Sequence, residues 1–220
     1  MEVSTKPKKA IGDDAIWEKA TKGLMDALDE NGISYGIDEG GGAFYGPKID
    51  IKITDALKRK WQCGTIQVDF NLPERFELEY TDSNNEKARP VMLHRAILGS
   101  FERFIGILTE HCAGEFPFFI APTQVIIIPV AESHIEYAKK IQKELIDIEI
   151  DSEVSSKNES LNKRIRVAEK QRVPLIVVVG DEEVKNSSIA LRDRRERTRS
   201  SMGLDEFKNL LKEKMDGVIF

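Results

Sequence analysis

Residues 125–128 have the sequence Val-Ile-Ile-Ile, and residues 175–179 have the sequence Leu-Ile-Val-Val-Val. Strands that are apolar along their whole length are covered on both faces, which is typical of a mostly parallel sheet with helices on each side. The surrounding residues indicate three helices and two shorter strands: helices over 132–146, 161–170 and 203–214, and strands over 148–152 and 189–191. The C-terminal part is therefore predicted to be an α/β domain.

The N-terminal part has a different periodicity. Isoleucines alternate with polar residues over 49–53, and a second alternating pattern covers 61–70, as expected for half-buried strands. Two more strands and two helices complete the pattern: strands near 78–80 and 91–93, and helices over 13–30 and 96–111, where apolar residues recur at helical spacing. These elements predict antiparallel strands flanked by two helices.

Two prolines bracket a connecting segment, residues 114–122, and the character of the sequence changes after it. We therefore expect two domains, residues 1–120 and residues 121–220. The predicted fold class is α/β, with an α+β antiparallel-sheet portion followed by an α/β domain.

The composition limits the possible functions. A chain of 220 residues with net charge −5 and pI near 5.4 is not a generally basic nucleic-acid binder, although a local basic patch is compatible with these values. The longest apolar stretch, residues 124–131, is much shorter than the roughly 20 residues that span a bilayer. The N-terminus shows no secretory signal, and only Cys63 and Cys112 are cysteines. We therefore expect a cytoplasmic protein with no membrane partner.

Several residues could carry chemistry, and each also has a purely structural explanation. The strand face formed by Cys63, Thr65, Gln67 and Asp69 is either an ordinary solvated face or the floor of a polar pocket. The glycines at 40–42 indicate either a flexible connection or a close approach of the backbone to a ligand.

His94 and the arginines leave similar alternatives open. His94 is either a hydrogen-bonded structural histidine or a metal ligand, and no cysteine or histidine lies nearby at zinc spacing. Arg103, three residues after Ser100, can extend past apolar neighbours to solvent, or it can stack on a base and hold a phosphate. Five arginines within eight residues form either a solvated loop or a phosphate-binding patch: Arg192, Arg194, Arg195, Arg197 and Arg199.

Three segments, in this order, resemble threonyl-tRNA synthetases. They are Gly-Ala-Phe-Tyr-Gly-Pro-Lys-Ile-Asp at 42–50, Gln-Cys-Gly-Thr-Ile-Gln-Val-Asp-Phe at 62–70, and Val-Met-Leu-His-Arg-Ala-Ile-Leu-Gly-Ser-Phe-Glu-Arg-Phe at 91–104. Residues 99–103 resemble motif 3 of class II aminoacyl-tRNA synthetases. Residues from 124 onward resemble the family's anticodon-binding domain, an α/β module with a mixed sheet. The resemblance covers essentially the whole chain.

The resemblance implies a ligase that activates threonine with ATP and Mg and transfers it to tRNA(Thr), with a zinc ion that binds the amino and hydroxyl groups of threonine. Engaging the hydroxyl matters because van der Waals contact alone separates threonine from valine by only about 10²-fold. His94 matches a zinc ligand, and Arg103 matches the arginine that stacks on adenine and reaches the γ-phosphate. The other matches lie in the ATP and threonine pocket or contact the anticodon: Tyr45, Lys48, Gln62, Thr65, Gln67 and Ser100 in the pocket, and Asn158, Glu183 and Arg192 in the anticodon-binding domain.

The family's motif 1, its motif 2 and two of its three zinc ligands correspond to sequence upstream of residue 1. Because motif 1 carries the dimer interface, we expect the full-length protein to be a homodimer. We expect residues 1–220 alone to bind zinc weakly or not at all and to form no threonyl adenylate. The alternative is a standalone, non-catalytic tRNA-binding module derived from a synthetase, although such a module would not need the pocket residues.

Overall fold

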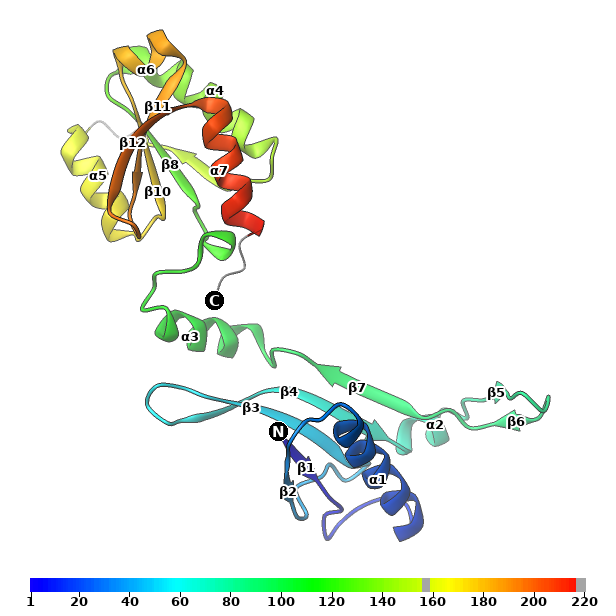
Figure 1. Ribbon diagram of the computed structural model, residues 1–220. Helices are drawn as coiled ribbons and strands as arrows, with labels where there is room; N and C mark the ends of the chain where they lie inside the picture. The colour runs from blue at the N-terminus through cyan, green and yellow to red at the C-terminus, as the bar shows by residue number, and fades with distance from the viewer. Residues whose placement is uncertain (156–158, 217–220) are drawn as a thin grey trace. The chain divides into compact units, whose positions relative to one another are not determined.

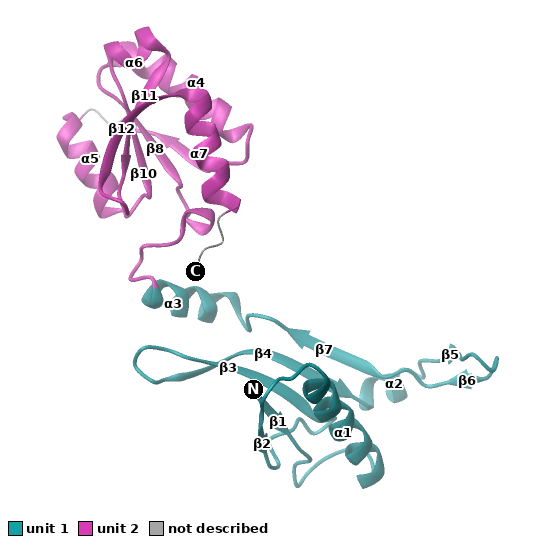
Figure 2. Cartoon of the chain, in the orientation of Figure 1, with its two compact units in different colours: residues 1–111 teal, residues 112–220 magenta. Residues whose placement is uncertain are grey.

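The computed structural model describes residues 1–155 and 159–216 (Figure 1). The chain forms two compact units, Met1–His111 and Cys112–Phe220, which we call unit 1 and unit 2 (Figure 2). Each unit has its own sheet and its own buried apolar residues. Among the described residues, no helix is both long enough and apolar enough to cross a membrane.

Unit 1 is built on a five-stranded sheet with the strand order β2-β1-β3-β4-β7. Its strands are β1 Glu2–Ser4, β2 Gly36–Asp38, β3 Lys48–Thr54, β4 Lys60–Asp69 and β7 Met92–Ala96. Neighbouring strands are antiparallel except β1 and β2, which are parallel. The expected antiparallel core of this part is confirmed.

Helix α1, Asp14–Glu30, packs on one face of this sheet. It begins where the Asp13 side chain accepts a hydrogen bond of 2.8 Å from the backbone N–H of Ile16, a typical N-cap. The apolar cluster shared by helix and sheet consists of Val3, Leu24, Leu28, Ile49 and Val68. Because side chains alternate along a strand, the polar residues of β3 and β4 lie on the opposite face.

The helix predicted over 96–111 begins later than expected. Strand β7 continues to Ala96, which pairs with Thr65, and Gly99 then adopts a φ of +73°. Glycine reaches this left-handed region without strain, so α3 covers only Phe101–His111. The shorter elements of unit 1 are α2 Asn71–Arg75, β5 Tyr80–Thr81 and β6 Lys87–Ala88.

The glycines before β3 allow backbone segments to touch. A Cβ atom at Gly46 would lie 1.8 Å from the carbonyl oxygen of Val68, and one at Gly42 would lie 2.5 Å from that of Thr5. Real Cβ atoms do not approach this closely, so larger residues would displace the connection. Close packing against unit 1 itself, rather than flexibility, explains these two glycines.

Unit 2 also has a five-stranded sheet, with the strand order β12-β11-β10-β8-β9. Its strands are β8 Val125–Pro129, β9 Ser152–Val154, β10 Leu175–Val179, β11 Ser188–Asp193 and β12 Thr198–Gly203. β9, β8 and β10 are parallel, whereas β11 and β12 run antiparallel to their neighbours. The sheet is therefore mixed, as the family resemblance implied, rather than mostly parallel as the apolar runs suggested.

Helices cover both faces of this sheet (Figure 1). Helix α5, Leu161–Lys170, packs on one face, and α4, Ile135–Ile146, and α7, Leu204–Asp216, pack on the other. The remaining elements are η1 Phe118–Ile120, η2 Glu132–His134 and α6 Asp181–Asn186. The predicted α/β fold class is confirmed.

Candidate functional site

Three of the candidate residues in unit 1 form one row across the sheet. Lys48 on β3 pairs with Gln67 on β4, and Gln67 pairs with His94 on β7. The next row begins with Asp50 opposite Thr65. Residues that are directly opposite share a face, so these side chains form one polar surface on the side of the sheet away from α1. We call this surface the unit 1 pocket face.

Asp50 organises one end of the pocket face. Its side chain is only 2% exposed. One carboxylate oxygen accepts a hydrogen bond of 2.7 Å from Nζ of Lys48, and the other accepts one of 2.6 Å from Nε2 of Gln62. A buried carboxylate is tolerated because both of its oxygens are paired. Asp50 therefore fixes the positions of two candidate pocket residues.

Asp69 fixes the position of His94 in the same way. Its Oδ2 atom lies 2.8 Å from Nε2 of His94, while its Oδ1 atom accepts hydrogen bonds from the backbone N–H groups of Asn71 and Leu72. Burial alone would raise the pKa of Asp69, but the hydrogen bonds from His94 and from these N–H groups outweigh burial and lower the pKa. An ionised carboxylate only accepts, so Nε2 of His94 donates to it.

This arrangement leaves Nδ1 of His94 as the nitrogen that could bind a metal. A histidine whose other ring nitrogen donates to a carboxylate is typical of metal sites. The residues present therefore fit a zinc ligand at His94. No group of three or more histidine, cysteine, aspartate or glutamate side chains in residues 1–155 and 159–216 could hold a metal ion together.

Tyr45 joins the middle of the row. Its hydroxyl donates a hydrogen bond of 2.6 Å to Oε1 of Gln67, and its ring meets the His94 ring edge to face at 6.1 Å. The Thr65 hydroxyl is buried, and no group in the described part of the chain forms a hydrogen bond with it. A buried polar group without a partner is unusual, and a bound ligand could provide the missing contact.

Arg103 reaches β4 from α3, and Ser100 directly precedes this helix. The Ser100 hydroxyl accepts the Arg103 backbone N–H at 3.3 Å, and Nη1 of Arg103 lies 3.5 Å from the carbonyl oxygen of Gln62. The structure thus brings six candidates together on one face of the sheet: Tyr45, Lys48, Gln62, Thr65, Gln67 and His94. Among the described residues, the Arg103 side chain reaches only the Gln62 carbonyl, and the Ser100 hydroxyl contacts only Arg103. Sequence reasoning missed the part played by Asp50 and Asp69, because polar residues are expected at these positions in any half-buried strand. Burial distinguishes Asp50 and Asp69 from ordinary polar residues of a half-buried strand.

A second row crosses the sheet of unit 2. Ile126, Ile176, Arg192 and Arg199 lie opposite one another on β8, β10, β11 and β12. The two isoleucines are covered by α5, whereas Arg192 is half-buried and Arg199 exposed. Like charges that face each other across two strands are destabilising. Neither arginine has an ion-pair partner in the part of the chain that the structure describes.

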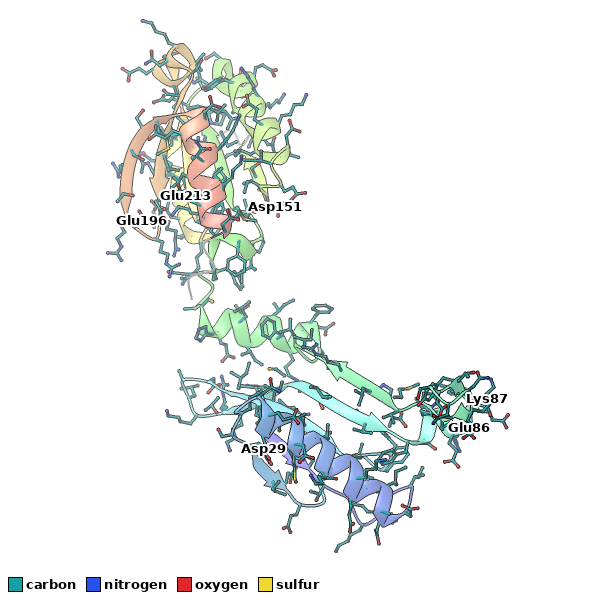
Figure 3. The ribbon with its side chains drawn as sticks, turned by 45° about the vertical axis from the view of Figure 1, so that its right-hand side comes forward. Asp29, Glu86, Lys87, Asp151, Glu196 and Glu213 are labelled. Carbon is teal, nitrogen blue, oxygen red and sulfur yellow. The ribbon has the colours of Figure 1, made fainter. Side chains whose placement is uncertain are left out.

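The five arginines identified in the sequence lie around one hollow of about 430 Å³. The hollow is at the turn between β11 and β12, where Glu196 is labelled in Figure 3. Arg194 donates to Glu115 at 2.5 Å, and the same carboxylate oxygen also accepts from Arg172. The other four arginines form no ion pair within the described residues, so this hollow suits an anion.

Glu183 lies on α6, directly after β10, and its Oε2 atom accepts the backbone N–H of Gly180 at 2.9 Å. This bond occupies one carboxylate oxygen. Asn158, the third candidate anticodon contact, lies outside the described residues. The structure therefore describes Glu183 and Arg192 of that set, and they lie toward opposite ends of the sheet: Glu183 follows the last residue of β10, whereas Arg192 pairs with Ile176 near the start of β10.

Two family models match the chain. Residues 6–112 match the class II tRNA synthetase core domain of the glycine, histidine, proline, serine and threonine enzymes, and residues 124–214 match the anticodon-binding domain. Across all 220 residues the chain is 74% identical to the threonine–tRNA ligase of Campylobacter jejuni subsp. doylei and 72% identical to that of Campylobacter lari. The chain belongs to the threonyl-tRNA synthetase family. It spans 36% of the length of either of these relatives.

Solved structures agree with this family assignment. The RNA-binding domain of threonyl-tRNA synthetase from Cryptosporidium parvum Iowa II matches 97% of this chain, with a TM-score of 0.89 and 38% identity, over 54% of its own length. A threonyl-tRNA synthetase structure from Aeropyrum pernix, described as ThrRS-1, matches the same shares with a TM-score of 0.71 and 29% identity.

Proposed function

We propose that this chain is the part of a threonine–tRNA ligase that reads the anticodon of tRNA(Thr) with unit 2 and forms one wall of the ATP and threonine pocket with unit 1. The observation that carries the proposal is the pair formed by Arg192 and Arg199. Two guanidinium groups that lie opposite each other, with no ion-pair partner among the described residues, attract an anion, and an RNA loop offers phosphates and base edges to arginine.

In unit 1, we assign Arg103 to adenine stacking and to the γ-phosphate of ATP, which Mg accompanies. A planar, permanently charged group suits both contacts. Lys48 and Gln62, both held by Asp50, and the unpaired Thr65 hydroxyl supply further donors to the same ligands. His94 would bind zinc, which supplies a Lewis-acid centre for the amino and hydroxyl groups of threonine.

The alternative, a tRNA-binding module without catalysis, is less well supported. Asp50 is buried and pairs with Lys48 and Gln62, and Asp69 is buried and pairs through one oxygen with His94. A protein that only binds RNA would not need Lys48, Gln62 and His94 to be held on one face of unit 1. The domain boundary at residue 120, a homodimeric full-length protein and a cytoplasmic location stay predictions.

The test is binding of an anticodon stem-loop. We expect the chain to bind a fluorescent tRNA(Thr) stem-loop more tightly than the same stem-loop with an exchanged anticodon, at about 100 mM salt. Arg192→Ala should weaken cognate binding by roughly ten-fold or more, since a good arginine contact is worth about 1–3 kcal/mol. Arg172→Ala, which removes an arginine already paired with Glu115, is the control. Equal affinities for both RNAs would refute the proposal.

A further inference from the structure

Arg164 is a buried charge that stability does not explain. It lies in the first turns of α5 and is 8% exposed. No carboxylate pairs with it in the described residues, and its Nε atom is buried without a hydrogen-bond partner. Buried arginines are normally paired, because removing an ion from water is costly. A side chain kept at this cost calls for another explanation.

The guanidinium lies between the ends of two parallel strands. Nη1 is 3.3 Å from the carbonyl oxygen of Ser155, which follows β9, and Nη2 is 3.5 Å from that of Val130, which follows β8. Both hydrogen bonds are long and therefore weak. These hydrogen bonds connect the residues that directly follow β8 and β9, at the carboxyl ends of the two strands.

The segment after β8 contacts the residues that precede Glu183. The Val130 N–H donates to the carbonyl oxygen of Val179 at 2.8 Å, and the Val130 side chain lies beside Gly180, where an added Cβ atom would be 3.4 Å away. Gly180 in turn donates to Glu183 at 2.9 Å. Arg164 is thus linked to Glu183 through Val130 and Gly180.

We propose that Arg164 is a positioning residue for anticodon reading, which fixes Val130 relative to Ser155 so that Glu183 meets its base in a defined place. The proposal rests on the proposed function of unit 2. Because Arg164 is only 8% exposed and contacts the Val130 carbonyl, it acts through Val130 and touches no phosphate itself.

The experiment compares Arg164→Met and Arg164→Lys with the wild-type chain, and Arg172→Met is the matched control. We measure binding of the cognate stem-loop and of the anticodon-exchanged one, the salt dependence of binding, and thermal unfolding. Arg164→Met should lower the ratio of the two affinities about ten-fold, the size of one lost base reading. The slope of log affinity against log salt should not change, and Arg164→Lys should restore part of the ratio.

Other outcomes would overturn the proposal. A slope reduced by about one would mean direct phosphate contact. An unchanged ratio, or equal weakening of both RNAs with a midpoint lowered by more than about 8 °C, would mean a merely structural role. Amide NMR of the free chain supplies a second test, because Arg164→Met should shift the Val130, Gly180 and Glu183 signals. If the wild-type chain cannot distinguish the two RNAs, the proposed function itself fails. If the amide signals of Val130, Gly180 and Glu183 do not shift in Arg164→Met, the link from Arg164 to Glu183 is refuted, whatever the RNA binding shows.

Discussion

At the scale of single residues, the sequence predicts candidate pocket side chains but not the residues that hold them in place. The resemblance marked Lys48, Gln62 and His94, and the structure shows that Asp50 and Asp69 orient them. Alternation along β3 and β4 predicts which residues share a face. It does not predict which of those polar residues is buried, because burial depends on segments that are distant in the chain.

Asp50 should be much more important for stability than an exposed aspartate. In Asp50→Asn the amide cannot form the ion pair with Lys48, so the free energy of unfolding of unit 1 should fall by about 1–3 kcal/mol. The control is Asp26→Asn, which removes an exposed i,i+4 pair with Lys22 and should cost under about 0.5 kcal/mol. Urea unfolding measures both. Equal costs would show that the Asp50 cluster is not a stabilising centre.

Asp55, at the end of the β3–β4 hairpin, should make stability depend on acid pH. Hydrogen bonds from Trp61 and Arg59 hold its pKa at about 2. Since this folded-state pKa lies below the unfolded value of about 3.9, the stabilisation is complete above pH 4 or so and is lost as the pH falls toward 2. Carboxyl NMR titration should place the Asp55 midpoint near 2, and Asp55→Asn should flatten unfolding stability over this range. A midpoint near 4 would contradict the prediction.

At the scale of elements, the long periodic segments were predictable and the short ones were not. The helices expected over 13–30 and 161–170 are α1 and α5. Helix α6 has six residues, and β12 is mostly polar and exposed, so neither carries an apolar signal. The strand expected over 148–152 is instead a turn before β9. Ile148 and Ile150 pack into the core from that turn, so their alternation resembled a strand.

Two glycines of unit 1 should respond in opposite directions to alanine. Gly46→Ala places a methyl group against the Val68 carbonyl, so the loop that carries Tyr45 must move, and unit 1 should lose stability. Gly23→Ala, on α1 with nothing within 4 Å, should add about 0.5–1 kcal/mol because alanine favours helix. Urea unfolding of both variants tests the pair, and a neutral Gly46→Ala would show that the close approach is not required.

At the scale of the whole molecule, two apolar runs and the change of periodicity after the connecting segment 114–122 were enough to predict two different architectures in one chain. They were not enough to predict that the sheet of unit 2 is mixed. Strand direction depends on connections, and the polar hairpin of β11 and β12 is antiparallel because its turn is short. That hairpin also places Arg192 opposite Arg199, which no pattern of single residues reveals.

The central claim is that this arginine pair binds the RNA backbone and its bases. The most direct measurement is the salt dependence of stem-loop binding by the wild type and by the Arg192→Ala/Arg199→Ala double variant. If both guanidinium groups contact phosphates, the slope of log affinity against log salt should become shallower by about 1.4, or 0.7 for each contact on a single strand. The Arg172→Ala control should keep the wild-type slope. An unchanged slope and affinity in the double variant would contradict the account.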